Sequence, residues 1–352
     1  MTPHPVGWTD RLASLLDAVD GADRLFVLTH DNPDPDALAS AAAMAVLLDR
    51  TTGKTPRVAF GGIVGRAENR AVIHELEIDF ERLEDIEVTP GSTITLVDTQ
   101  PRAGNNSLPE GRIVSAVVDH HPVRSDTAVQ FTDVRPGLGA CATMMVQYLR
   151  AADLEPDAWL ATALFYAIQA ETMDLSREAT PEDVEASTYL YALGDPAAIS
   201  RIRHPRVPVS YFRSLHTALA AATRHERVVA VPMISLPYPD LVAEIADLLL
   251  QMHGVDWAVA IGRFRDRLLV SVRARQSGAH AGSLVRTAFG DRGSAGGHGT
   301  FAGGQIDVRG KSDEEVVELA AEVMQDLLIG LEVDADTGDL LVTPPRPDGE
   351  TT

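Results

Sequence analysis

Three apolar runs in the first half of the chain are each followed directly by acidic and histidine side chains. They cover residues 24–29, 93–97 and 113–118, and the last two are almost continuously apolar, as strands buried on both faces of a sheet are. A further short run lies at 57–60, and helical patterns begin near residue 36 and resume at 140–151, 158–169 and 181–192. This alternation predicts an α/β fold with a doubly wound, mainly parallel N-terminal sheet and helices on both faces.

A length of 352 residues is enough for about two domains. A second set of signals predicts a smaller α/β C-terminal domain across a cleft, with strands at 228–234, 257–264 and 267–274 and helices at 239–252 and 312–328. The predicted boundaries are 1–194 for the first domain, 195–227 for an arginine-rich helical connector, 228–333 for the second domain and 334–352 for a loose, polar tail.

Composition excludes several classes of protein. The formal net charge of −21 opposes a protein that coats long nucleic acid, so we expect no long duplex partner. The single cysteine, Cys141, rules out a disulfide framework and a cysteine-rich zinc site, and we expect it to be a buried small side chain. Without an apolar stretch of about 18 residues or a secretory signal pattern, the chain is expected to be cytoplasmic, with no membrane partner.

The side chains that follow the three runs are of metal-binding types. Because the carboxyl ends of parallel strands meet at one edge of a sheet, they are expected to converge. Mixed carboxylates and imidazoles suit Mn²⁺, and less exclusively Mg²⁺, Fe²⁺ or Zn²⁺. Several converging carboxylates repel one another unless cations neutralise them, and four or more ligands indicate two ions about 3.5–4 Å apart. The residues are His30, Asp34 and Asp36, then Asp98, then Asp119, His120 and His121.

Each cluster alone has a simpler interpretation. Residues 30–36 are also typical of a turn that leads into a helix cap, and Asp98 of a strand-end cap. It is the combination of the three clusters that favours a metal site.

The ordered pattern H-x-x-x-D-x-D, then D, then D-H-H resembles the DHH phosphoesterases. The later stretch from Gly296 to Gly304, preceded by Ser271-Val272-Arg273, is similar to the DHH-associated domain of that family. The resemblance covers roughly residues 20–330 and is greatest to the branch of nanoRNases, 3′,5′-bisphosphonucleotide phosphatases and RecJ-like exonucleases. It also allows a homodimer formed through the first domain.

The resemblance implies a role for each residue of the clusters. It implies that Asp119 orients His120 and that His121 points toward the scissile phosphate as a hydrogen-bond donor or proton relay. The implied ligands are His30, Asp34 and Asp98 for one ion, and Asp36, Asp98 and His120 for the other, with Asp98 bridging.

One position departs from the family pattern. The family's fourth motif has an Asp-Thr pair that supplies a further ligand to the second ion, whereas this chain has Glu171-Thr172. The extra methylene moves the carboxylate by about 1.5 Å. Glu171 then binds the ion directly or through water, or the second ion is held weakly.

The glycine-rich stretch has two interpretations. It could be a mobile loop, or its backbone N–H groups could approach an anion closely. The resemblance implies the second, with a GGH loop in which Gly296, Gly297 and His298, together with Arg273, bind the substrate's other phosphate or terminal nucleotide. A cleft closed at one end favours short substrates.

We therefore predict a hydrolase, a manganese-dependent phosphoesterase that holds two ions and cleaves short oligonucleotides or small nucleotides. Its activity would be of the oligoribonuclease, bisphosphonucleotide phosphatase or exonuclease type. The alternatives are hydrolysis of cyclic dinucleotides, hydrolysis of pyrophosphate or polyphosphate, and a nucleotide-binding regulator weakened in catalysis by Glu171.

Overall fold

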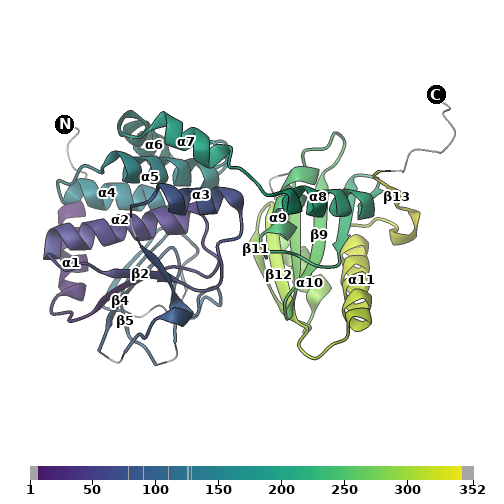
Figure 1. Ribbon diagram of the computed structural model, residues 1–352, viewed down its shortest axis with the longest axis horizontal. Helices are drawn as coiled ribbons and strands as arrows, with labels where there is room; N and C mark the ends of the chain where they lie inside the picture. The colour runs from purple at the N-terminus through teal and green to yellow at the C-terminus, as the bar shows by residue number, and fades with distance from the viewer. Residues whose placement is uncertain are drawn as a thin grey trace. The chain divides into compact units, whose positions relative to one another are not determined.

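The structure is a computed structural model. It describes residues 7–342 apart from residues 78, 90, 110, 125, 126, 128 and 277 and the side chain of residue 298. The chain divides into two compact units, Met1–Arg206 and Val207–Thr352, which are described separately below (Figure 1).

The first unit is built on a six-stranded sheet in which all neighbouring strands are parallel. The strand order is β3-β2-β1-β4-β5-β6, so the chain starts in the middle and winds to each edge in turn. The predicted parallel, doubly wound sheet is confirmed. The strands are β1 (Leu25–Leu28), β2 (Arg57–Phe60), β3 (Phe80–Arg82), β4 (Thr93–Val97), β5 (Val114–Asp119) and β6 (Phe131–Val134).

The helices of this unit cluster with one face of the sheet (Figure 1). Alternate strand residues point to opposite faces, so Val27 and Val118 pack with the helices while Phe26 and Val117 belong to a separate cluster on the other face. The helices are α1 (Trp8–Val19), α2 (Pro35–Thr52), α3 (Ala67–Glu75), α4 (Cys141–Ala151), α5 (Ala158–Glu171), α6 (Pro181–Leu193) and α7 (Pro196–Arg203).

The second face differs from the prediction of helices on both faces. Its apolar residues are covered by the short 3₁₀ helix η1 (Leu83–Asp85) and by connecting segments that supply Val88, Leu108 and Val129. Only 11 residues, 120–130, separate β5 from β6, which leaves little room for a crossover helix.

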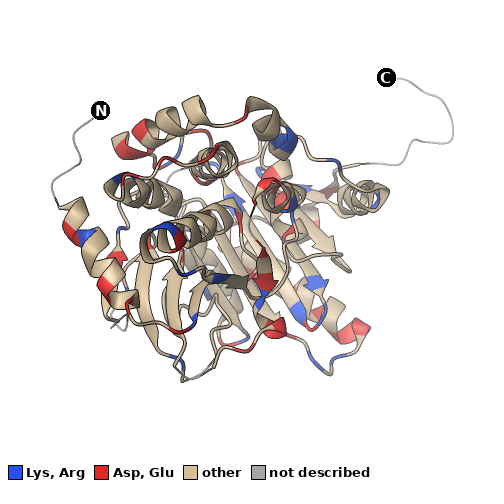
Figure 2. Cartoon of the chain, turned by 60° about the vertical axis from the view of Figure 1, so that its left-hand side comes forward, with Lys and Arg blue, Asp and Glu red and all other residues tan. Residues whose placement is uncertain are grey.

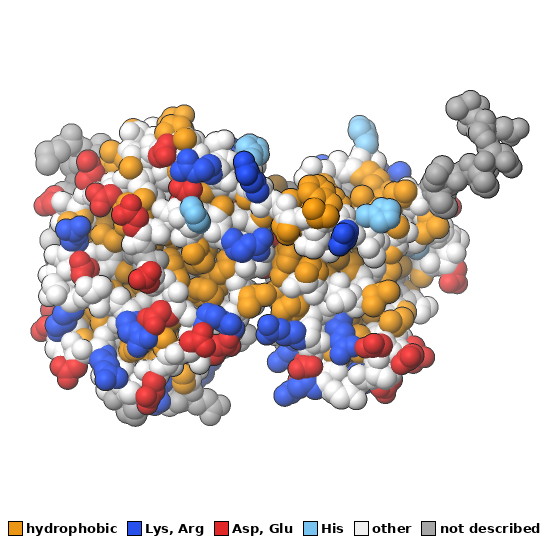
Figure 3. Space-filling view, in the orientation of Figure 1, with side chains coloured by type: hydrophobic (Ala, Val, Ile, Leu, Met, Phe, Trp, Pro, Cys, Tyr) orange, Lys and Arg blue, Asp and Glu red, His pale blue; other side chains and the backbone are white. Residues whose placement is uncertain are grey.

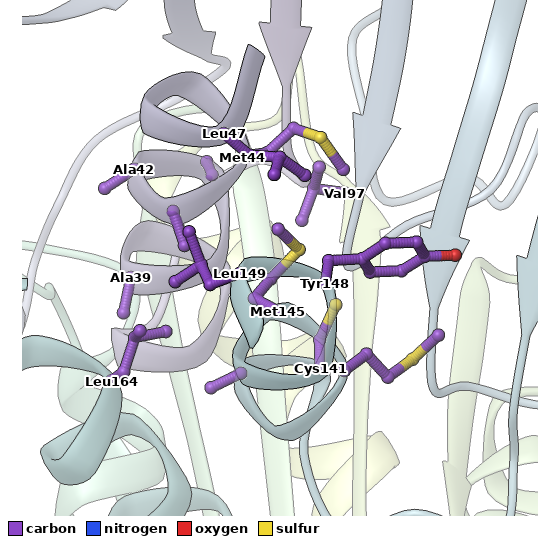
Figure 4. Packing of buried hydrophobic residues seen from close by; sticks show 14 of the residues in the cluster. Ala39, Ala42, Met44, Leu47, Val97, Cys141, Met145, Tyr148, Leu149 and Leu164 are labelled. Atoms are coloured by element: carbon purple, nitrogen blue, oxygen red, sulfur yellow. The ribbon is translucent and has the colours of Figure 1, made fainter. Parts of the chain in front are cut away.

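Helices α2 and α4 pack against each other through apolar side chains. Figure 4 shows α2 and α4 in contact through Met44, Leu47, Met145 and Leu149. Cys141 is fully buried among these side chains, as expected. This apolar layer fixes the N-terminal ends of α2 and α4.

The second unit contains a seven-stranded mixed sheet in the order β11-β12-β10-β9-β8-β7-β13. Helices α8 and α9 cover one face and α10 and α11 cover the other. The strands are β7 (Thr223–His225), β8 (Val228–Met233), β9 (Trp257–Phe264), β10 (Arg267–Ala274), β11 (Ser294–His298), β12 (Phe301–Asp307) and β13 (Asp339–Leu340). The helices are α8 (Val209–Ala221), α9 (Leu241–Leu249), α10 (Ala281–Phe289) and α11 (Asp313–Gly330).

The glycine-rich stretch is regular structure and not the predicted loop. Gly296 and Gly297 lie in the edge strand β11, which pairs antiparallel with β12 through a turn at Gly299. Glycine disfavours a strand by itself, so the sequence signal was that of a loop. The ladder with β12 and packing against α10 override that preference.

The predicted connector and tail also contain ordered elements. The division between the units falls at residues 206–207, inside the predicted connector, so α7 belongs to the first unit and α8 to the second. Within the predicted tail, η2 (Ala335–Thr337) precedes β13, which pairs with β7, and residues 343–352 are outside the described part.

Charged residues of both signs are distributed over both units (Figure 2). The face shown in Figure 3 mixes acidic and basic side chains with apolar ones in each unit. Among the described helices, none combines the length and apolar character needed to cross a membrane.

Candidate metal centre

The candidate residues lie at the carboxyl ends of β1, β4 and β5, in the centre of the first sheet. From β1 the chain proceeds toward β2 and β3, and from β4 it proceeds in the opposite direction toward β5 and β6. Ligand sites in open α/β sheets form at such a reversal, because the connecting segments diverge there and leave space.

The β1–α2 loop supplies His30 and Asp34. Asp34 is the N-cap of α2, and its Oδ1 accepts the backbone N–H of Ala37 at 3.0 Å. His30 Nδ1 lies 2.9 Å from the backbone oxygen of Asp31 and donates to it, so Nε2 is the unprotonated atom of the neutral ring. Nε2 is 3.8 Å from Asp34 Oδ1. Asp34 is therefore a helix cap, as the simpler interpretation predicts, and the same Oδ1 also faces His30.

Asp98 lies between the other residues. It follows β4 with a left-handed backbone, φ 58°, a conformation that non-glycine residues adopt mainly under constraint. Its Oδ2 is 3.6 Å from His30 Nε2, and its Oδ1 is 3.5 Å from His120 Nε2. Oδ1 is buried and accepts no hydrogen bond from the described residues. A buried carboxylate oxygen that faces an imidazole lone pair without a hydrogen bond is the environment of a metal ligand.

His120 is oriented by the backbone and not by the carboxylate of Asp119. Its Nδ1 lies 3.2 Å from the oxygen of Leu138, in the segment that leads into α4. Nε2 therefore faces the cluster, 3.5 Å from Asp98 Oδ1 and 3.7 Å from Asp36 Oδ2.

Asp36 has a structural role in addition to the predicted one. Its two oxygens accept the backbone N–H groups of Cys141 and Ala142, each at 2.7 Å, so it caps the N-terminus of α4. Ser40 donates to Oδ1 at 3.2 Å. Each carboxylate oxygen has two lone pairs, so these contacts hold the group in place and leave a direction toward His120 open.

Asp119 is bonded to His121, which differs from the expectation that it orients His120. Asp119 Oδ1 is 2.8 Å from His121 Nδ1 and also accepts the backbone N–H of His121 at 3.2 Å. The Asp119 carboxylate therefore bonds the ring of His121, two residues further along the chain. The ring of His120, the adjacent residue, points toward Asp98 instead. His121 is 43% exposed and so accessible to a substrate.

Glu171 is the last residue of α5, and the charges of other candidate ligands shift its pKa. Burial, followed by the charges of Asp34 and Asp36, raises its pKa to about 7, and His120 acts in the opposite direction. Glu171 therefore lies within electrostatic reach of candidate ligands from both predicted sets. Asp174, the neighbouring acid, is exposed and pairs with Arg203 at 2.8 Å.

The sequence analysis did not select Gln100, which the structure places beside Asp119 in the site. It is buried, and its Nε2 donates to Asp119 Oδ2 at 2.6 Å. Its position two residues after a candidate ligand was the available signal.

Burial, together with repulsion among the carboxylates, determines the protonation of the cluster. Burial, followed by the charge of Asp34, raises the pKa of Asp36 to about 7. Burial and the charges of Asp36 and Asp34 raise the pKa of Asp98 well above its ordinary value. Burial lowers the pKa of His30, but the carboxylate of Asp34, 3.8 Å from Nε2, outweighs it and brings that pKa to about 9. Without a metal ion, the cluster therefore retains protons. A bound divalent cation would replace these protons in compensating the negative charge.

The ligand atoms fit metal ions. Two groups each have their ligand atoms within 4.8 Å of one another, His30 with Asp34 and Asp98, and Asp98 with His120 and His121. Asp98 is common to both. The first group matches the predicted first ligand set, and the second shares Asp98 and His120 with the predicted second set.

Comparison with known proteins identifies the family. Residues 24–168 match the family model "DHH family, N-terminal domain", and residues 234–329 match the "DHHA1 domain". The chain belongs to the DHH family. The matched ranges include all the strand-end clusters in the first unit and the glycine-rich strands in the second.

Related proteins share long parts of the chain. An uncharacterized protein of Methanocaldococcus jannaschii is 35% identical over 308 residues, covering 85% of this chain and 62% of that protein. The manganese-dependent inorganic pyrophosphatase of the same organism is 29% identical over 188 residues, covering 50% of this chain and 57% of that enzyme. The chain thus matches less than two thirds of the length of either relative.

The crystal structure of an exopolyphosphatase-related protein from Bacteroides fragilis has the same fold. It superposes with a TM-score of 0.66 at 14% identity and covers 92% of this chain and 98% of that one. The two-unit α/β architecture is therefore shared despite low sequence identity.

In the second unit, Arg273 and the glycines lie on neighbouring strands. Arg273 is opposite Phe301, which is opposite His298, and Ser271 is opposite Gly303, which is opposite Gly296. Residues directly opposite in a ladder share a face, so these positions form two adjacent rows. Arg273 Nε donates to Asp247 at 2.6 Å and its guanidinium lies 6.0 Å from the Phe301 ring centre. The described residues give His298 a backbone position but no side-chain placement.

We expect Asp98→Asn to stabilise the protein in EDTA and to remove its response to Mn²⁺. The substitution removes a buried carboxyl group that, without metal, must either take up a proton or place a charge among like charges, and the same group faces both imidazoles. Thermal unfolding should show a higher Tm than wild type without metal and no increase with Mn²⁺. Glu185→Gln, at an exposed ion pair with Arg150, serves as control and should leave both values unchanged. A normal Mn²⁺ response in Asp98→Asn contradicts the assignment.

We also expect the metal-free protein to lose stability as the pH rises from about 4 to about 9. The pKa values of Asp36 and Glu171 are raised to about 7 and that of His30 to about 9, so the folded state binds more protons than the unfolded chain in this window. Urea unfolding in EDTA between pH 5 and 8 should show a falling free energy of unfolding. Saturating Mn²⁺ should oppose the trend, because its ligands bind deprotonated. A free energy that rises with pH in EDTA contradicts this electrostatic description.

Proposed function

We propose that this chain is a manganese-dependent phosphoesterase that holds two ions and hydrolyses phosphate esters of short oligonucleotides or small nucleotides. The observation that supports it most is the placement of Asp98. Its two oxygens face the Nε2 atoms of two different histidines, at 3.6 and 3.5 Å, and Oδ1 has no hydrogen-bond partner among the described residues. A carboxylate in this position bridges two ions in two-metal hydrolases.

The ligands form two sets that share this bridge. His30, Asp34 and Asp98 would hold one ion, and Asp36, Asp98 and His120 the other, with Glu171 completing the second set. When bound, such ions polarise phosphoryl oxygens and lower the pKa of a coordinated water to near neutrality. The hydrogen bonds of His30 and His120 to backbone oxygens present both Nε2 atoms before an ion arrives, which reduces the ordering needed on binding.

His121 is the proposed proton donor to the leaving oxygen or hydrogen-bond donor to the phosphoryl group. Its ring is 43% exposed, unlike that of His120, so a substrate can reach it. The bond from Nδ1 to Asp119 favours the charged imidazolium, and it leaves Nε2 to carry the proton that is transferred. Asp119 thus orients the ring and balances its charge.

We propose that residues of the second unit bind the substrate. Gly296 and Gly303 are exposed and lie opposite each other, and a methyl group would meet nothing within 4 Å at Gly296 and one oxygen at 3.5 Å at Gly303. Packing therefore gives no reason for glycine at either position. Gly296 and Gly303, which lack side chains, form a flat surface beside Arg273 and Phe301, here called the floor. A nucleotide can approach the backbone there, and the Arg273 guanidinium can bind its phosphate.

Pyrophosphate is the strongest competing substrate. The pyrophosphatase relative has 29% identity to this chain, which favours shared phosphate chemistry, but the match covers 50% of the chain. Hydrolysis of cyclic dinucleotides and a regulatory role without turnover are the remaining alternatives.

The deciding experiment is a substrate panel with Mn²⁺ and an EDTA control. The panel contains dinucleotides, five-mers, long single strands, 3′,5′-bisphosphoadenosine, cyclic di-AMP and pyrophosphate. We expect turnover of the short or small nucleotides, loss of at least about 10³-fold in Asp98→Ala because the bridge is removed, and a smaller loss in Glu171→Ala. Turnover of pyrophosphate alone would replace the proposed substrate class. Full metal-dependent activity in Asp98→Ala would contradict the site itself.

We expect Gly303→Ala to raise KM about tenfold, corresponding to about 1.4 kcal/mol of binding, while kcat and stability stay near wild type. The added methyl occupies the floor but has ordinary contact with the protein. Gly304→Ala is the matched control, because its methyl would lie 2.5 Å from the buried ring of Phe289. It should lower the free energy of unfolding by about 1–3 kcal/mol and leave the KM of the folded protein unchanged. An unchanged KM in Gly303→Ala rules out the floor as a binding surface.

A further inference from the structure

Gln100 is a buried amide that uses its full hydrogen-bonding capacity beside the site. Its Nε2 donates to Asp119 Oδ2 at 2.6 Å and to the backbone oxygen of Pro122 at 3.1 Å. Its Oε1 accepts the backbone N–H of Arg124 and the hydroxyl of Thr127, each at 3.0 Å. Two donors and two acceptors are the most that a carboxamide provides, so this side chain has one orientation available.

The contacts also determine which end of the amide faces Asp119. A backbone N–H can only donate, so the atom near Arg124 must be the oxygen, and the nitrogen must face the carboxylate. Pro122 adds a backbone oxygen on the same side as Asp119, which again requires a donor there.

Asp119 in turn has a different partner on each oxygen. Oδ2 accepts from Gln100, and Oδ1 accepts from the backbone N–H and from Nδ1 of His121. With Oδ2 held by the amide, Oδ1 stays 2.8 Å from Nδ1, and a carboxylate in that position requires Nδ1 to carry a proton. The exposed Nε2 is then the atom that exchanges a proton with a substrate.

We propose that Gln100 is a positioning residue that sets the ring orientation and tautomer of His121 through Asp119. None of the four partners of the Gln100 amide is one of the proposed metal ligands. Without its amide, Asp119 loses its contact on Oδ2 and can rotate, and His121 Nδ1 loses its fixed acceptor. The effect on catalysis rests on the proposed function, whereas the effect on the tautomer does not.

The neutral amide is suited to this position. A glutamate at residue 100 would bring a second carboxylate to within hydrogen-bond distance of Asp119 and of the Pro122 oxygen, which repels both. Exchanging the two groups, as Gln100→Glu with Asp119→Asn, restores a donor–acceptor pair: Asn Nδ2 donates to the carboxylate and Asn Oδ1 accepts from His121.

The test compares Gln100→Met, Gln100→Glu and the exchanged double variant with wild type. We expect kcat to fall about 10–100-fold in the single variants, the range for residues that orient an active group, with KM and Mn²⁺ affinity near wild type. The double variant should recover part of the loss relative to Gln100→Glu. Thr127→Val, which removes one bond to Oε1 and leaves the bond to Asp119, is the control and should keep kcat within about twofold.

A second readout needs no turnover. Nitrogen-15 NMR of the histidine side chains, with Mg²⁺ at pH 8.5 and His121 assigned through His121→Gln, should show protonated Nδ1 in wild type and a tautomer mixture in Gln100→Met. An unchanged tautomer in folded Gln100→Met, or an equal loss of kcat in Thr127→Val, overturns the proposal. If wild type hydrolyses no substrate in the panel, the proposed function fails, and the NMR comparison still decides the role of Gln100.

Discussion

Repulsion among buried carboxylates is the constraint on which the first unit depends. Asp36 and Asp98 are almost completely buried, and Asp34 and Glu171 add negative charge to the same place. Such a cluster is unfavourable for folding unless protons or cations neutralise it. The helix caps formed by Asp34 and Asp36 use two of these carboxylates, and the proposed metal site accounts for the unfavourable presence of all four together.

The surrounding structure holds these groups with backbone contacts and little help from other charges. Asp36 accepts two N–H groups at the start of α4, and His30 and His120 each bond a backbone oxygen. The β1–α2 loop is held on its other side as well, where Ser107 donates to Asp31 through its backbone and its hydroxyl. These contacts place the ligand atoms before any ion binds, and the apolar layer of α2 and α4 prevents the loop from relaxing.

The two units contribute different chemistry. The first concentrates negative charge and imidazole, whereas the two adjacent rows of positions in the second contain Arg273, Phe301 and exposed glycines. Gly304 is glycine because Phe289 occupies the space beside it, but Gly303 has room for a side chain. Packing therefore requires glycine at residue 304, whereas glycine at residue 303 is accounted for by the proposed approach of a substrate.

The sequence alone was sufficient to predict the strands with strong apolar runs, such as β2 and β9. It was also sufficient to predict that the residues at the strand ends converge. It missed β3, β6 and α10, which are short or partly polar and are stabilised mainly by neighbouring elements. It also treated the glycine strands as a loop, because the pairing partner that makes them a ladder cannot be seen in local propensity.

Within the site, the chain itself determined which residue types follow each strand, and parallel strands then bring them to one edge. Only the tertiary structure decided their partners. Asp119 reaches His121 and not His120, Asp36 caps a helix 105 positions further along the chain, and Gln100 holds Asp119 from the neighbouring strand end. Hydrogen bonds depend on ring rotation and atom positions within a few tenths of an ångström, and spacing in a sequence does not encode these.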